Sequence, residues 1–167
     1  MGVFDGVEPD TGHDIIDRAT ELCRELKADL IVSLGGGSSM DTAKVAQLCV
    51  TNGGKAIDNI AIMRLVGPQI PHIAIPTTHG TGSEVTAVAV ILNKKLKKKG
   101  FATELYMIPN VAILDAKLTV GLPRSMSAGS GMDALTHAIE SALSAKHTPI
   151  STAMALEAIS RIKKYLP

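Results

Sequence analysis

The chain has 167 residues, of which 46% are hydrophobic, enough for one medium-sized domain or for a domain and part of a second. Its 17 Lys and Arg nearly balance its 16 Asp and Glu, and a net charge of +1 argues against a nucleic-acid-binding protein. Aromatic residues make up only 2%, which leaves few stacking platforms for single strands or glycans. Because no apolar run could span a membrane and no signal peptide precedes the chain, we expect a soluble, cytoplasmic protein without membrane partners.

The first half of the chain predicts alternating helices and strands. Apolar residues recur at helical spacing in two segments, and two short apolar runs are typical of strands buried on both faces of a parallel sheet. The predicted elements are a helix over 14–27, a strand over 30–32, a helix over 41–49 and a strand over 72–76. Cys23 and Cys49 fall in the helical segments without a CxxC pair, so we expect buried free thiols.

The second half of the chain differs from the first in its pattern of predicted helices and strands. Residues 86–92 and 111–115 predict two more strands, and the five lysines in 94–99 between them are typical of a solvated turn. Beyond Pro123 the pattern is purely helical, over 131–145 and 150–165. We therefore predict an α/β domain over residues 1–122 and the beginning of an all-α domain over 123–167.

A glycine-rich turn, Gly35–Ser38, follows the first predicted strand and precedes the helix that contains Asp41. Glycine permits positive φ and lets an anion approach the backbone closely. The free N–H groups and the positive end of the helix dipole point back at such a turn. The turn matches neither GxGxxG nor the P-loop. Two interpretations stay open: a phosphate-binding turn, or a tight connection in which Ser38 caps the helix.

A second polar loop follows the strand predicted at 72–76. Residues 77–83 contain three threonines, a serine and two glycines, a dense set of neutral donors that suits phosphate or ribose oxygens. An ordinary polar loop has the same composition. Because both loops follow buried strands, they are expected at the edge of the sheet where ligands bind in open α/β folds.

A carboxylate and an imidazole lie four residues apart in the predicted helix over 131–145. Asp133 and His137 would share one helix face, where they could hold a cation of the Fe or Zn type. A catalytic metal site has about three protein ligands, so this pair alone is too small a set. A solvated or hydrogen-bonded pair is the alternative interpretation.

With these motifs in view, the chain resembles the iron-containing (group III) alcohol dehydrogenase family. The resemblance covers nearly the whole chain and rests on four motifs: Gly35–Ser38 with Asp41 and Lys44, Pro76–Thr78 with Gly80–Glu84, Pro109–Asp115, and Gly131–Leu135 with His137–Glu140. It implies a Rossmann-like dinucleotide-binding α/β domain followed by a helical metal-binding domain, the architecture of dehydroquinate synthase. Nicotinamide and metal would meet between the two domains.

The resemblance also implies which residues form the site. The pyrophosphate would be held by three residues: Gly36, Gly37 and Ser38. Further residues would line the cofactor: Asp41 beside it, Thr77, Thr78, Thr81 and Thr86 on the adenosine and ribose side, Lys99 at the ribose, and Asp10 where the family has an Asn. Two metal ligands would be Asp133 and His137, with no other catalytic side chain assigned.

The implied activity is an NAD- or NADP-dependent oxidoreductase that uses Fe²⁺ or Zn²⁺ to interconvert small alcohols and aldehydes or ketones, in a homo-oligomer. Two further ligand histidines and the first strand of the family lack counterparts here, so the resemblance implies an internal fragment. His79 stands where the family has Ala or Ser, without an assigned role. The rival hypothesis is a non-catalytic nucleotide-binding fragment with an incomplete metal site.

Overall fold

The computed structural model describes residues 1–59 and 67–166, which divide into two compact units. The first unit comprises Met1–Pro76 and Ser83–Asp115, and the second comprises Thr77–Gly82 and Ala116–Pro167. The short loop Thr77–Gly82 thus belongs with the helical part of the chain, although it follows directly on a strand of the α/β part. The predicted domain boundary at residues 122–123 stays a prediction.

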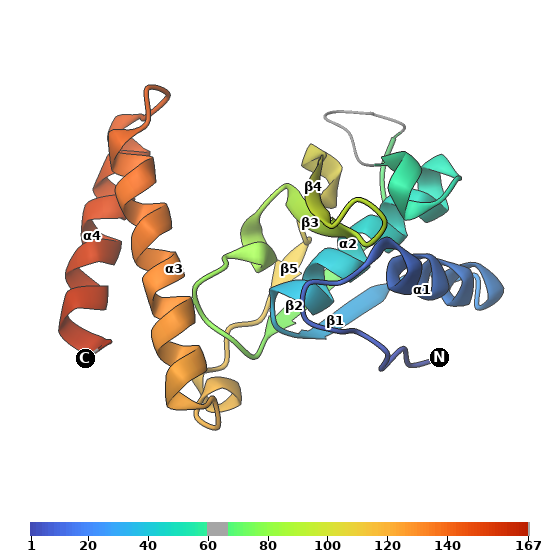
Figure 1. Ribbon diagram of the computed structural model, residues 1–167, viewed down its shortest axis with the longest axis horizontal. Helices are drawn as coiled ribbons and strands as arrows, with labels where there is room; N and C mark the ends of the chain where they lie inside the picture. Colours follow the sequence, from blue (N-terminus) through green and yellow to red (C-terminus); the bar gives the residue numbers. More distant parts are fainter. Residues whose placement is uncertain (60–66, 167) are drawn as a thin grey trace. The chain divides into compact units, whose positions relative to one another are not determined.

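The first unit is built on a parallel sheet of three strands in the order β1-β2-β5 (Figure 1). The sheet and its helices have these bounds: α1 His13–Glu25, β1 Ile31–Gly35, α2 Gly37–Asn52, β2 His72–Pro76 and β5 Val111–Ala112. Parallel strands joined through helices are the arrangement of a Rossmann-like fold. The predicted α/β class is therefore confirmed.

The strand predicted at 30–32 is not buried on both faces, and this expectation was wrong. Ser33 and Ala74 are buried on one side of the sheet, whereas Val32 is 54% and Leu34 61% exposed on the other. Side chains alternate along a strand, and α2 is the helix that packs against β1 and β2. Within the described part of the chain, the face that carries Val32 and Leu34 has no such helical cover.

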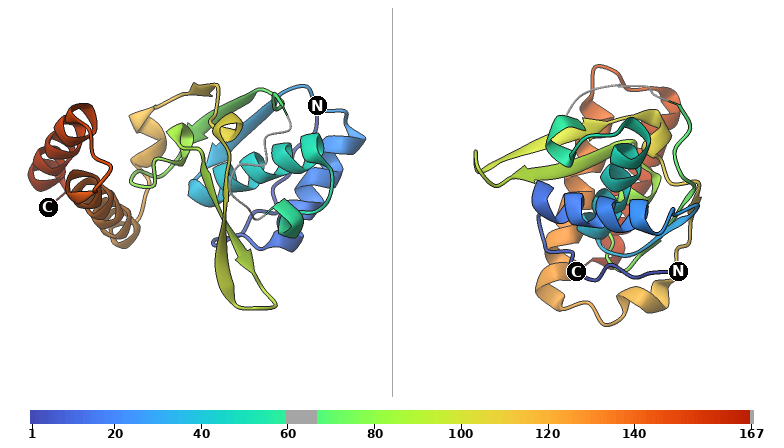
Figure 2. Two further views of the ribbon diagram at one scale, coloured as in Figure 1. Left: turned by 90° about the horizontal axis from the view of Figure 1, so that it is seen from above. Right: turned by 90° about the vertical axis from the view of Figure 1, so that its right-hand side faces the viewer.

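The strand predicted at 86–92 pairs away from the parallel sheet. It forms an antiparallel hairpin, β3 (Val88–Asn93) with β4 (Lys98–Thr103), and the lysine-rich residues 94–97 form its turn. Figure 2 shows this hairpin as an arm distinct from the sheet. Three hairpin residues, Ala89, Ile91 and Ala102, pack into the core with residues of α1, α2 and two short turns. The members from these other segments are Ile16, Val45, Leu48, Cys49, Ala56 and Met107. Cys23 and Cys49 are free thiols, and Cys49 is buried as predicted, so that burial raises its pKa to about 11. Cys23 is only half-buried, so the prediction of burial was wrong for it.

The second unit is a helical pair, α3 (Arg124–Leu143) and α4 (Pro149–Tyr165), which lie side by side (Figure 1). A capping box begins α4, in which Ser151 N donates to Thr148 Oγ1 at 3.1 Å. Pro149 follows at the first helical position, where its missing N–H costs nothing. The all-α continuation is thus confirmed, and none of the described helices is both long and apolar enough to cross a bilayer.

His72 makes the stability of the first unit sensitive to pH. Its ring is fully buried in β2, with Nε2 2.8 Å from Ser33 Oγ. Burial, together with the nearby Lys44 ammonium, lowers the pKa of His72 from 6.5 to about 4. The unfolded chain therefore binds more protons than the folded chain between these two values. Stability is complete above pH 6.5 and declines as the pH falls through this window.

We expect acidification from pH 6.5 to pH 4 to cost the folded chain up to about 3 kcal/mol through His72 alone. The measurement is the free energy of unfolding in urea across this pH range, for the parent and for His72→Gln, which retains a hydrogen-bonding partner for Ser33. Carboxylates titrate in both proteins, so the difference in slope isolates the imidazole. Equal slopes of unfolding free energy against pH in the two proteins would contradict the assignment of this pH dependence to His72.

Candidate functional site

The turn between β1 and α2 requires glycine at its first position. Gly35 has φ +151°, and a Cβ there would lie 2.3 Å from Ser39 Oγ. Gly36 is the N-cap residue and Ser38 lies within the first turn, so the interpretation of Ser38 as the cap was wrong. Because Gly36 has no side chain with which to cap, the first N–H groups of α2 keep their capacity to bind an anion.

Two predicted cofactor residues from distant parts of the chain gather at this turn. The backbone N–H of Asp10 donates to Ser38 Oγ at 3.2 Å, and Lys99 Nζ donates to Asp10 Oδ1 at 2.7 Å. Both charged side chains are at least half exposed. Asp10 adopts φ +53°, a left-handed conformation that Asp tolerates better than most residues. The structure thus places Asp10, Ser38 and Lys99 together.

Strand pairing explains why these residues meet. The register of the hairpin places Lys99 opposite Leu92, and Leu92 N donates to Thr11 O at 3.0 Å. Asp10 precedes Thr11, so its carboxylate comes within reach of the Lys99 ammonium. The hairpin register therefore brings Lys99, which lies on β4 just after the lysine-rich turn, next to Asp10 near the start of α2. Lys94, at the same turn, pairs with Asp14 at 2.9 Å instead.

Beneath the turn, a fully buried lysine connects α2 to the segment 83–88. Lys44 Nζ donates to Ser83 Oγ at 2.8 Å, to Thr86 Oγ1 at 3.1 Å and to Val88 O at 3.0 Å. Burial lowers the pKa of Lys44 to about 8, against the opposing effect of Asp41 and Glu84. Thr86, a predicted cofactor residue, is thus held in place by a buried cation.

Asp41 points into the same network. Its Oδ1 accepts from Ser83 Oγ at 2.6 Å, and its Oδ2 accepts from Val90 N at 2.9 Å. Burial raises the pKa of Asp41, while the hydrogen bond from Ser83 lowers it. These contacts describe a carboxylate that joins α2 to β3, and its direct contact with a cofactor stays a prediction. Sequence analysis missed Ser83 as the shared partner; the spacing of Asp41 and Lys44, one helical turn apart, was the available signal.

The remaining predicted threonines lie in the second unit. Thr77 and Thr78 are half-buried and Thr81 is exposed, all within the loop Thr77–Gly82. Gly36, Gly37 and Ser38 belong to the first unit. That the two sets bind one dinucleotide stays a prediction from the resemblance.

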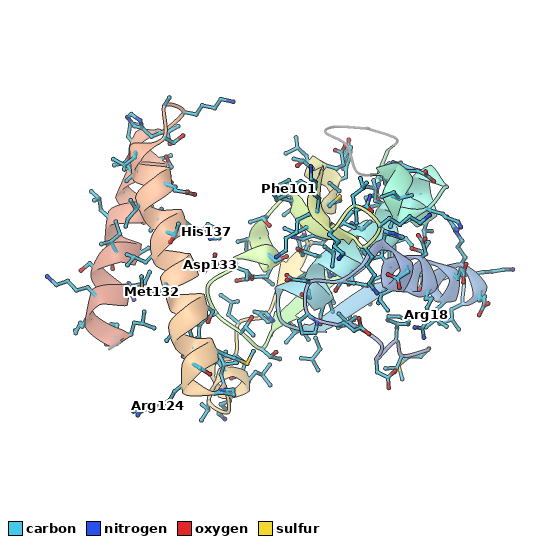
Figure 3. All side chains as sticks on the ribbon, viewed as in Figure 1. Arg18, Phe101, Arg124, Met132, Asp133 and His137 are labelled. Carbon is cyan, nitrogen blue, oxygen red and sulfur yellow. The ribbon has the colours of Figure 1, made fainter. Side chains whose placement is uncertain are left out.

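Asp133 and His137 lie one turn apart on α3, as the spacing predicts (Figure 3). His137 Nε2 is 3.8 Å from Asp133 Oδ1, and the side chains are 55% and 46% exposed. This donor pair suits Fe²⁺ or Zn²⁺ in chemistry and in helical spacing. Among residues 1–59 and 67–166, no cluster of three His, Cys, Asp or Glu side chains is placed to hold a metal. That Asp133 and His137 are metal ligands stays a prediction.

Comparison with known proteins covers both units. Residues 1–116 match the family described as iron-containing alcohol dehydrogenase, and residues 127–167 match the C-terminal family of Fe-containing alcohol dehydrogenases. The chain is 38% identical to the NAD-dependent methanol dehydrogenase of Bacillus methanolicus, over 100% of this chain and 44% of that protein. It is also 38% identical to the 1,3-propanediol dehydrogenase of Citrobacter freundii, over 98% of this chain and 42% of that protein.

The fold agrees with solved structures. The sulfoacetaldehyde reductase of Bifidobacterium kashiwanohense, solved with NAD⁺, matches with a TM-score of 0.93 at 37% identity, over 100% of this chain and 45% of that one. The chain spans less than half the length of the curated relatives it matches. These relatives are oxidoreductases of alcohols and aldehydes. On the match of both sequence and structure, the chain belongs to the iron-containing alcohol dehydrogenase family.

Proposed function

We propose that this protein is an NAD- or NADP-dependent, metal-dependent oxidoreductase that interconverts small alcohols and aldehydes or ketones. The observation that carries the proposal is the meeting of Asp10, Ser38 and Lys99 at the uncapped start of α2. Three segments of a family member thus meet at one place, where the Lys99 ammonium and the first N–H groups of α2 can bind an anion beside the Asp10 carboxylate. The cytoplasm and a homo-oligomeric state belong to the same proposal, on the resemblance alone.

The turn and Lys99 fit the charge of a dinucleotide. The N–H groups of Gly37 and Ser38, at the positive end of α2, would bind the pyrophosphate. Lys99 would contact the ribose, and Thr86, which accepts a hydrogen bond from Lys44, would lie on the same side of the cofactor. Nicotinamide accepts the hydride, and the protein supplies binding and orientation.

Asp133 and His137 would provide two ligands of the metal. A bound Fe²⁺ or Zn²⁺ would supply Lewis-acid chemistry that lowers the pKa of an alcohol oxygen. The two side chains already share one face of α3, so they need no helical rearrangement to bind one ion. No general base is assigned to a side chain.

A second candidate is a nucleotide-binding protein without catalysis. It is favoured by one observation, that the described residues contain only two of the ligands that such a site needs. Binding of metal to the chain separates the two candidates.

We expect Zn²⁺ or Fe²⁺ to bind this chain, and His137→Ala to weaken that binding by about tenfold or more, because one of two donors is lost. Calorimetric titration with the metal alone provides the measurement. His147→Ala is the matched control, since the Nδ1 of that surface histidine is 2.7 Å from Ser144 O, away from the pair. No binding to the parent would favour the non-catalytic candidate, and equal affinity in His137→Ala would contradict the assigned ligand.

We expect the full-length protein to reduce NAD⁺ or NADP⁺ with a short-chain alcohol, and to lose this activity with a chelator. The absorbance of the reduced nicotinamide reports the reaction. Asp133→Ala should abolish it. Activity that survives complete removal of metal would contradict the assigned metal role.

Asp10 places a carboxylate where the dinucleotide phosphates would lie. We expect Asp10→Asn to tighten binding of the dinucleotide about three- to tenfold, since one like charge is removed and Lys99 is released. Lys99→Ala should weaken it by a similar factor, and Lys98→Ala, a neighbour on β4, serves as the charge-matched control. Fluorescence titration with the reduced cofactor measures all four proteins. The differences should shrink at high salt, and a weaker-binding Asp10→Asn would contradict the electrostatic reading.

A further inference from the structure

His79 bonds to α3 through both ring nitrogens. Its Nε2 is 2.9 Å from Ser127 Oγ, and its Nδ1 is 3.3 Å from Ser130 Oγ. The two serines are three residues apart and therefore share a face of the helix. All three residues belong to the second unit, so these bonds lie within one compact body.

The hydrogen-bond pattern selects one arrangement of protons on the ring. The Ser130 hydroxyl donates to Met126 O at 2.8 Å, so its oxygen is left to accept from His79 Nδ1–H. Nε2 then accepts from the Ser127 hydroxyl. A neutral imidazole thus satisfies both serines at once, which an Ala or Ser at position 79 could not do.

The backbone of the loop Thr77–Gly82 also lies close to α3, at Gly80. Gly80 has φ +114°, and a Cβ there would lie 2.0 Å from Ser130 O. Any other residue would both strain the backbone and collide with the helix. His79 and Gly80 together hold the loop Thr77–Gly82 on the first turns of α3.

The same helix face continues to the predicted metal ligands. Ser130 is one turn from Asp133 and two turns from His137. The loop that begins with Thr77 and Thr78 is thus bonded, through His79, to the helix that carries both ligands. Side chains held in this way lose little further freedom when a ligand binds.

We propose that His79 is a positioning residue, which holds the nucleotide-binding threonines of its loop in a set position relative to Asp133 and His137. This inference rests on the proposed function. It assigns a role to the one loop residue that departs from the family pattern. His79 itself touches neither cofactor nor metal in this role.

The test compares dinucleotide affinity and metal affinity in the same chain. We expect His79→Ala to weaken binding of NADH about five- to tenfold, because the loop must then be ordered on binding, and to leave the affinity for Zn²⁺ unchanged. Ser127→Ala should weaken NADH binding as well, and the double variant should be no worse than His79→Ala alone. His79→Asn, whose amide can replace Nδ1–H toward Ser130, should restore part of the affinity.

Hydrogen exchange of residues 77–81 supplies a readout that is independent of the cofactor, and we expect faster exchange in His79→Ala but not in the control His147→Ala. Unchanged exchange, additive Ser127 and His79 effects, or an unchanged affinity for NADH would each overturn the positioning role. A parent chain that binds no NADH while its exchange responds as expected would instead overturn the proposed function, and would reduce His79 to a structural contact.

Discussion

The buried ammonium of Lys44 is the interaction on which the first unit depends. A buried cation is tolerated only when its donors are satisfied and a negative group lies near, and both conditions are met here by Ser83, Val88 and Asp41. Ser83 precedes β3 and Val88 begins it, whereas Asp41 lies on α2 beside Lys44. The ammonium therefore decides where the hairpin lies on α2. A hydrophobic contact alone would not specify this position, because it has no direction.

The candidate site follows from that position. Asp41 binds Val90 N, the hairpin register places Lys99 opposite Leu92, and Leu92 holds Thr11. Each step is a directional backbone or side-chain hydrogen bond, so an error of one residue in any of them would turn Lys99 to the other face of its strand. The ion pair of Asp10 and Lys99 at the start of α2 is the end of this series of contacts rather than a local property of either segment.

In the second unit, too, directional contacts hold the candidate site residues in place, but different chemical groups make them. An imidazole and a glycine join a loop to α3, and the ligand pair of the proposed metal site lies on the same helix one turn further along. The His79 side chain is exposed, whereas Ser127 and Ser130 are half-buried. The loop with the proposed cofactor threonines and the helix with the proposed metal ligands thus belong to one unit and are joined through His79.

The amino-acid sequence by itself determined the helices and parallel strands, the glycine turn at Gly35 and the Asp133–His137 pair, because these depend on periodicity, on positive φ and on spacing along one helix. Its resemblance to a family added the candidate site residues. Only the tertiary structure decided that residues 86–92 form a hairpin, that Val32 and Leu34 face outward, and that Asp41 turns inward to Ser83. Strand partners, burial and the direction of a side chain are set by contacts between residues far apart in the chain. The local sequence pattern does not specify these contacts.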